Sequence, residues 1–168
     1  YALPVIDAGL DLSVCPNTSV TLNGAGGVSY TWDNSVSNGV AFTPTTTTTY
    51  TVTGTDANGC LNTDQLQVTL FVPPIVDAGL DVEVCTGTSV TFFGSGAATY
   101  SWDGGVIDGQ SFVPAVGSYT FTVTGTDANG CVDTDAADLL VNPNPVVNAG
   151  PDQLICPGAT TSLSGSGA

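Results

Sequence analysis

The sequence predicts an all-β protein made of small antiparallel β-sandwiches that follow one another along the chain. Two observations predict this class. Apolar and polar residues alternate with the two-residue period of strands, and no segment carries the apolar stripe of a helix. In addition, a sequence unit of about 70 residues occurs more than once, which indicates a repeat architecture.

The repeat is clearest at the cysteines and at one turn. Cys15, Cys85 and Cys156 follow one another at spacings of 70 and 71 residues. The ten residues 51–60 return unchanged as residues 122–131. One structural unit is therefore reused, and such units usually set reach and spacing rather than supply chemistry.

Proline-containing stretches at residues 72–75 and 142–145 mark the linkers between copies. We expect a linker tail over residues 1–4, complete repeats over 5–74 and 75–145, and a partial third repeat, with only its first two strands, over 146–168. Proline stiffens a linker. We therefore expect the sandwiches to be arranged as a rod.

Each repeat shows short strands separated by turn signals. In the first repeat, alternation gives these apolar faces: Val20 and Leu22; Val28, Tyr30 and Trp32; Leu66, Val68, Leu70 and Val72. The turn Asp56-Ala57-Asn58-Gly59 predicts a hairpin, because Asn-Gly tolerates positive φ. About seven strands in 70 residues, with a tryptophan on the third, predict an immunoglobulin-like sandwich. Trp32 and its copy Trp102 are expected in the cores rather than on a sugar-binding surface.

The composition makes several functions improbable. The chain contains no Lys, Arg, His or Met, and its formal net charge is −15. Binding to nucleic acid or to an anionic membrane surface requires cationic side chains. No apolar stretch is long enough to span a bilayer. Without His or Lys, acid–base and Schiff-base catalysis lack their usual groups, so we expect no enzyme and no catalytic residue.

The five cysteines occupy two recurring positions, one before the first tight turn and one after the Asn-Gly turn. The chain has no His and no Cys-x-x-Cys, so disulfides in an oxidising compartment are favoured over a metal site. The preferred pairs lie within repeats, Cys15–Cys60 and Cys85–Cys131, with Cys156 unpaired by truncation. The two turns of a sandwich normally lie at opposite ends, too far apart for a disulfide. The alternative Cys15–Cys131, which joins one repeat to the next, therefore stays open.

One calcium site can be proposed at the start of the second repeat. Asp77 and Asp81 lie there, and the turn residues Asp127 and Asn129 are expected at the same end. Ca²⁺ takes six to eight oxygen ligands, and oxygen-rich clusters at domain junctions can supply them. The competing interpretation is that these residues cap turns. We expect no other cofactor.

The segments Tyr30-Thr31-Trp32-Asp33 and Tyr100-Ser101-Trp102-Asp103, followed by Thr-Asp-Ala-Asn-Gly-Cys, resemble the PKD-like immunoglobulin-type repeats of Bacteroidota surface adhesins and type IX-secreted proteins. The resemblance covers the whole chain. The stricter signature Trp-Asp-Phe-Gly-Asp-Gly is replaced by Asn34-Ser35 and Gly104-Gly105 after the Trp-Asp pair, which favours the looser PKD-like group. The resemblance implies an extracellular or cell-surface location in a bacterium.

The sequence therefore predicts a non-catalytic extracellular structural repeat protein. Its role would be the stalk of a surface adhesin or the subunit of an extracellular filament. Expected partners are other copies of itself or adjacent repeats, and also surface glycans or proteins. The alternative function is an accessory spacer or carbohydrate-binding module of a secreted polysaccharide hydrolase.

Overall fold

The computed structural model describes residues 2–167. These residues form twelve strands and no helix, so the all-β prediction is confirmed. It follows that the described residues contain no helix able to cross a membrane. The chain divides into two compact units. The first comprises Tyr1–Val76, Ser95–Tyr100 and Thr124–Thr134; the second comprises Asp77–Gly94, Ser101–Val123 and Asp135–Ala168. The repeat boundaries expected from the sequence stay predictions.

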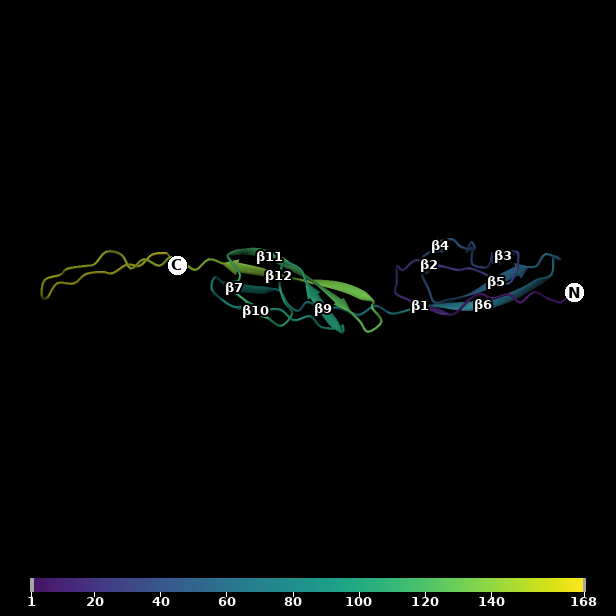
Figure 1. The fold of residues 1–168 in the computed structure, drawn as a ribbon. Helices are drawn as coiled ribbons and strands as arrows, with labels where there is room; N and C mark the ends of the chain where they lie inside the picture. The colour runs from purple at the N-terminus through teal and green to yellow at the C-terminus, as the bar shows by residue number, and fades with distance from the viewer. Residues whose placement is uncertain (1, 168) are drawn as a thin grey trace. The chain divides into compact units, whose positions relative to one another are not determined.

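The first repeat forms six strands (Figure 1). They are β1 (Leu12–Val14), β2 (Val20–Thr21), β3 (Ser29–Trp32), β4 (Ala41–Phe42), β5 (Thr48–Thr55) and β6 (Leu61–Leu70). One sheet has the order β1-β6-β5-β3, and the second sheet pairs β2 with β4. The longest strands, β5 and β6, form the antiparallel hairpin that the Asp56–Gly59 turn predicts.

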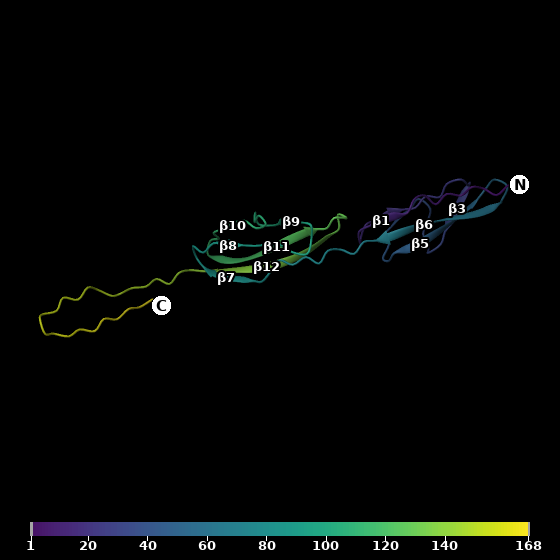
Figure 2. The same cartoon turned by 90° about the horizontal axis from the view of Figure 1, so that it is seen from below.

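The second repeat forms six strands in the same arrangement. They are β7 (Val82–Cys85), β8 (Val90–Thr91), β9 (Thr99–Trp102), β10 (Ser111–Phe112), β11 (Gly117–Thr126) and β12 (Val132–Asn142). One sheet has the order β7-β12-β11-β9, and β8 pairs with β10. Figure 2 shows β7, β12 and β11 side by side. The two complete repeats therefore have the same fold, and the prediction of tandem immunoglobulin-like sandwiches is confirmed.

One strand pair in each repeat is parallel, which corrects the expectation of purely antiparallel sheets. β1 pairs in parallel with β6, with Leu12 opposite Val68 and Val14 opposite Leu70. β7 pairs in the same way with β12. The first strand joins the sheet beside the last strand and runs in the same direction. The end of the first strand therefore lies beside the end of the repeat, and this position decides where its cysteine can bond.

The core of the first repeat is made by side chains that alternate along its strands. The buried members are Ile6, Ala8, Leu22, Trp32, Tyr50, Val52, Leu66 and Val68. Trp32 is 8% exposed, as is Trp102 in the second repeat, so both tryptophans pack in cores as predicted. Val28 and Val72, which the alternation assigned to inward faces, are instead mostly exposed. Each lies just outside a strand, where the pleat no longer sets its direction.

The indole N–H of the core tryptophan is satisfied in the same way in both repeats. Trp32 Nε1 donates to Asn38 Oδ1 at 3.0 Å, and Trp102 Nε1 donates to Asp108 Oδ1 at 2.9 Å. The same acceptor oxygens take the backbone N–H of Gly24 and of Gly94, respectively. A buried indole N–H without an acceptor would be costly. The side chain six residues after each tryptophan therefore belongs to the fold.

Residues 146–167 contain no strand, so the two strands expected there are absent from the described part of the chain. The segment doubles back, and Asn148 and Ser166 exchange two backbone hydrogen bonds of 2.9 Å, as Asp7 and Ala25 do at 3.1 and 2.9 Å in the first repeat. β1 and β2 form by pairing with β6 and β4. Residues 146–167 have no corresponding partners in the structure, and their apolar side chains are exposed.

Candidate functional site

A disulfide joins Cys15 to Cys131, with Cα atoms 5.4 Å apart. Both residues belong to the first compact unit, which includes the Asp127–Cys131 turn of the second repeat. Cys131 is 1% exposed, and Cys15 is half-buried. The bond is the alternative pairing of the sequence analysis. The preferred pairs Cys15–Cys60 and Cys85–Cys131 are not formed.

The register of the first repeat explains why Cys15 and Cys60 do not bond. Cys60 comes immediately before β6, which is 10 residues long. Cys15 follows Val14, which lies opposite Leu70 at the far end of β6. At roughly 3.3 Å per residue, about 30 Å separates the two ends. A disulfide needs Cα atoms within about 7 Å, so a bond within the repeat is excluded.

The other three cysteines have free thiols. Cys60 is half-buried, and Cys85 and Cys156 are exposed. Cys85 holds the same position in the second repeat as Cys15 in the first, and Cys60 holds the position of Cys131. Both halves of the observed bond are thus present a second time, as thiols.

The three aspartates among the proposed calcium ligands each accept backbone hydrogen bonds. Asp77 Oδ1 accepts the N–H of Gly79 at 2.8 Å, and Asp81 Oδ1 accepts that of Asp138 at 2.9 Å. Asp127 Oδ1 accepts two backbone N–H groups at 2.8 Å, one from Asn129 and one from Cys131. No group of three or more His, Cys, Asp or Glu within residues 2–167 is arranged to hold a metal ion. Calcium binding stays a prediction.

Two aspartates that the sequence did not single out hold the start of each repeat in place. Asp64 Oδ2 on β6 accepts the N–H of Ala8, and Asp135 Oδ2 on β12 accepts that of Ala78, both at 2.8 Å. These backbone hydrogen bonds hold the pKa of each carboxyl below its usual value. The backbone N–H of Cys60 does the same for the pKa of Asp56. A Thr-Asp pair begins three residues after Cys60 and again three residues after Cys131. This repetition was the sequence pattern that could have pointed to Asp64 and Asp135.

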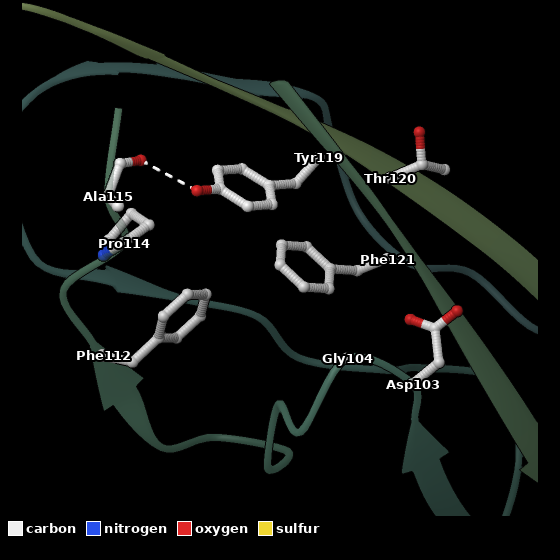
Figure 3. A pocket seen from close by; sticks show the side chains of 8 residues that line it. All are labelled: Asp103, Gly104, Phe112, Pro114, Ala115, Tyr119, Thr120 and Phe121. Atoms are coloured by element: carbon white, nitrogen blue, oxygen red, sulfur yellow. Dashed lines mark hydrogen bonds between the residues drawn. The ribbon is translucent and has the colours of Figure 1, made fainter. Parts of the chain in front are cut away.

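The second compact unit carries a hollow of about 390 Å³ on its surface. Its lining residues are Asp103, Gly104, Phe112, Pro114, Ala115, Tyr119, Thr120 and Phe121 (Figure 3). The rings of Tyr119 and Phe121 stack, with centroids 5.9 Å apart and planes at 9°. Tyr119 Oη donates to the carbonyl of Ala115 at 3.2 Å. In the first repeat, Thr48 replaces the tyrosine, so the full aromatic group belongs to the second repeat alone.

No protein-family model matches this chain, and no curated protein matches it. Among solved structures, it is similar to the fibronectin(III)-like modules of Clostridium thermocellum CbhA. The identity is 11%, the TM-score is 0.38, and the match covers 84% of this chain and 95% of that one. The insect immune protein hemolin matches at 17% identity and a TM-score of 0.42, over 84% and 47% of the two chains.

Sidekick-1 immunoglobulin domains 1–4 match at 17% identity and a TM-score of 0.40, over 83% of this chain and 48% of that chain. The chain thus spans about half the length of the Sidekick-1 and hemolin structures. These likenesses are at the level of immunoglobulin-like and fibronectin-like folds. The assignment of the fold rests on the strands and their order in this chain.

Proposed function

We propose that this chain is a non-catalytic structural repeat protein that works outside the cell, as the stalk of a surface adhesin or as the subunit of an extracellular filament. The observation that carries the proposal is the Cys15–Cys131 bond, which ties a cysteine of the first repeat to a turn of the second. A covalent bond between consecutive repeats limits how far one can move against the other. A protein that transmits force along an array needs this property.

Three further features support an extracellular rod. Disulfides persist in oxidising compartments such as cell surfaces. The absence of Lys and Arg removes every cleavage site for trypsin-like proteases. The net charge of −15 makes neighbouring chains repel one another. Together with the PKD-like resemblance, these features favour the surface of a bacterium of the Bacteroidota type.

The partners that suit this role are further copies of the same unit. Repeats of a stalk contact their neighbours along the array, and filament subunits contact other subunits. If the chain is a stalk, it would carry an adhesive tip, and that tip would bind surface glycans or proteins. The linkers Val72-Pro73-Pro74 and Pro143-Asn144-Pro145 would keep the sandwiches in line.

Electron microscopy of the purified native protein tests this role. Separate thin threads with a regular beaded spacing are the expected result for a stalk. Helical fibres with a fixed repeat are the expected result for a filament. Compact single particles that neither extend nor assemble would contradict both forms of the proposal.

A second function, carbohydrate binding beside a polysaccharide hydrolase, is favoured by the hollow of the second repeat. Sugar sites combine aromatic faces with a few polar groups, and the hollow has stacked Tyr119 and Phe121 beside Asp103. Co-sedimentation with insoluble polysaccharides tests this function. The variant Tyr119→Thr has the residue of the first repeat at that position. If carbohydrate binding is the function, the parent should sediment and Y119T should remain in solution.

A further inference from the structure

The two repeats share one fold, but the side chains around the hollow of the second repeat differ from their counterparts in the first. Five positions that carry a small polar side chain in the first repeat have glycine, an aliphatic or an aromatic residue in the second. The pairs are Asn34 and Gly104, Ser37 and Ile107, Thr43 and Val113, Thr46 and Val116, and Thr48 and Tyr119. Because the first repeat folds in the same way with polar residues, the fold does not require the apolar ones.

The aliphatic side chains that the second repeat gains are exposed rather than packed. Ile107, Val113 and Val116 are each more than half exposed. Ile107 lines a smaller hollow of about 140 Å³, which shares Gly104 and Phe112 with the larger one. The two hollows therefore adjoin, and we call them together the groove. Apolar side chains gathered at such a place mark an interaction site.

Three aromatic rings line the larger hollow (Figure 3). Phe112 and Phe121 meet edge to face, with centroids 5.8 Å apart and planes at 82°, while Tyr119 stacks on Phe121. Tyr119 is half-buried, so part of its ring stays accessible. The faces of aromatic rings attract cations.

The first repeat shows which group satisfies the carboxylate at the edge of this region. Asp33 Oδ1 accepts the backbone N–H of Thr51 and the side-chain N–H of Asn34, both at 3.0 Å. The same Asn34 nitrogen donates to the carbonyl of Thr49 at 3.4 Å. One nitrogen with two N–H donors therefore lies between a carboxylate and a backbone carbonyl.

In the second repeat the carboxylate is kept, but the nitrogen is missing. Asp103 Oδ1 accepts the backbone N–H of Thr122 at 2.9 Å, and no side chain among residues 2–167 donates to Asp103. Gly104 takes the place of Asn34, and a Cβ there would come within 2.8 Å of the Phe121 ring. The exposed carboxylate of Asp103 thus lines the hollow together with the aromatic rings (Figure 3).

We propose that the groove binds a segment of a partner protein in which a lysine or arginine lies among apolar residues. The cationic group donates to Asp103, which is the role that an asparagine N–H has in the first repeat. Its aliphatic stem lies on the rings of Tyr119 and Phe121. The neighbouring apolar residues of the segment contact Ile107 and Val113. This proposal goes beyond the stalk or filament role and does not depend on it.

Charge favours this ligand over two others. The chain has no Lys, Arg or His, so the cation cannot come from a side chain of a second copy. The net charge of −15 attracts a cationic segment toward the groove. A neutral sugar, the ligand of the alternative carbohydrate function, would place hydroxyl groups against Ile107 and Val113 and would leave the charge of Asp103 without a partner.

Nuclear magnetic resonance of the ¹⁵N-labelled full chain tests the proposal. The probe is the blocked peptide acetyl-Leu-Lys-Leu-amide, and its neutral counterpart carries acetyllysine in place of lysine. The amide signals of Gly104, Phe112, Tyr119 and Phe121 should shift with the lysine peptide until they saturate. The neutral peptide should bind about fivefold more weakly, because it lacks the ion pair and the cation–π contact.

Three variants identify the groups that bind. Asp103→Asn keeps an acceptor for the N–H of Thr122 but removes the charge, so D103N should bind both peptides equally and weakly. Asp33→Asn is the matched control, because it changes the net charge equally at the corresponding position of the first repeat. D33N should keep the fivefold preference for the lysine peptide. Tyr119→Thr, which has the residue of the first repeat, should weaken the binding of both peptides.

Several results would overturn the proposal. They are shifts spread over the whole chain, equal affinity of the parent for the two peptides, and loss of the preference in D33N as well as in D103N. Tighter binding of cellohexaose than of the lysine peptide at these signals would assign the groove to the carbohydrate function instead. If D103N fails to fold, the comparison of the two peptides on the parent and on Y119T still decides. None of these results alters the structural role, which electron microscopy tests.

Discussion

At the scale of single residues, the fold of each repeat depends on carboxylates that bind backbone N–H groups. Asp64 and Asp135 hold the segments around Ala8 and Ala78 against the last strands. The two alanines themselves are buried, with Ala8 and Ala78 2% and 1% exposed. Because the chain has no cationic side chain, no ion pair between two side chains can replace these hydrogen bonds. The aspartates therefore act as parts of the backbone scaffold rather than as solubilising charges.

These carboxylates should make the protein sensitive to acid. Hydrogen bonds from Ala8 and Gln65 lower the pKa of Asp64 in the folded state, so the folded protein binds the proton less readily than the unfolded chain. The stabilisation from Asp64 is then complete above its ordinary pKa of about 4 and is lost as the pH falls through the lower, folded-state pKa. Urea unfolding followed from neutral pH to about pH 2.5 should show this loss.

Variants at Asp64 identify the source of the effect. Asp64→Asn keeps an acceptor oxygen but cannot be protonated, so its stability should fall less steeply with acid than that of the parent. Asp152→Asn is the matched control, because no hydrogen bond to the Asp152 side chain is present among residues 2–167. If D64N and the parent lose stability in parallel, the Asp64 hydrogen bond is not the acid-sensitive element.

The acceptor beside the core tryptophan gives a second prediction. Asn38 Oδ1 takes the Nε1–H of Trp32 and the N–H of Gly24. Replacing it with alanine leaves both donors without this acceptor and should lower the free energy of unfolding by about 1–2 kcal/mol. Asn38→Asp reproduces the second repeat, where Asp108 has the same two contacts, and should be tolerated. Chemical denaturation measures both variants, and equal losses for N38A and N38D would contradict this account.

At the scale of elements, one glycine controls how the start of the first repeat meets the segment between β2 and β3. Gly26 has φ of +85°, and a Cβ there would overlap the carbonyl oxygen of Val5. Gly26→Ala should therefore destabilise the protein by about 3 kcal/mol or more, from the positive φ and the backbone clash together. Gly59→Ala separates the two effects. Its φ is +81° and nothing lies within 4 Å of the added Cβ, so it should cost only about 1 kcal/mol.

Thermal unfolding of the two glycine variants measures the difference. A shift for G26A no larger than that for G59A would mean that the Val5 contact relaxes without cost. The same close approach occurs between Gly96 and Ile75 and between Gly167 and Val146. The turn is thus a recurring part of the unit, and Gly96→Ala should repeat the result in the second repeat.

Strands whose pattern is local could be predicted from the sequence, and those that depend on a distant partner could not. The alternation around Leu66 and Val68 gave the buried face of β6 correctly, because a pleated strand fixes the direction of each side chain. The parallel pairing of β1 with β6 joins residues 56 positions apart, such as Leu12 and Val68. Nothing in either segment alone specifies that register. The Asp64 contact with Ala8 was missed for the same reason, since it depends on that pairing.

At the scale of the whole molecule, the cysteine pairing shows how far a repeat can be interpreted from sequence. The spacing gave the two recurring positions but could not say which ends of the units they occupy. Because β1 runs parallel to β6, Cys15 lies beside the C-terminal end of β6, whereas Cys60 lies at the N-terminal end of that strand. The pairing then has to join different repeats. The Cys15–Cys131 bond therefore depends on how consecutive repeats follow one another along the chain, and not on any single residue.

The excess of negative charge predicts that salt stabilises the folded chain. With a net charge of −15, the folded chain repels itself, and screening should raise the melting temperature. A gain of about 1 kcal/mol from low to physiological salt corresponds to about 3 °C for a chain of this size. The titration with NaCl is repeated with CaCl₂ and MgCl₂ at matched ionic strength. If the predicted calcium site at Asp77, Asp81, Asp127 and Asn129 exists, CaCl₂ should exceed MgCl₂ in the parent but not in Asp127→Asn. Equal shifts for the two salts would leave screening as the whole effect and remove the calcium site.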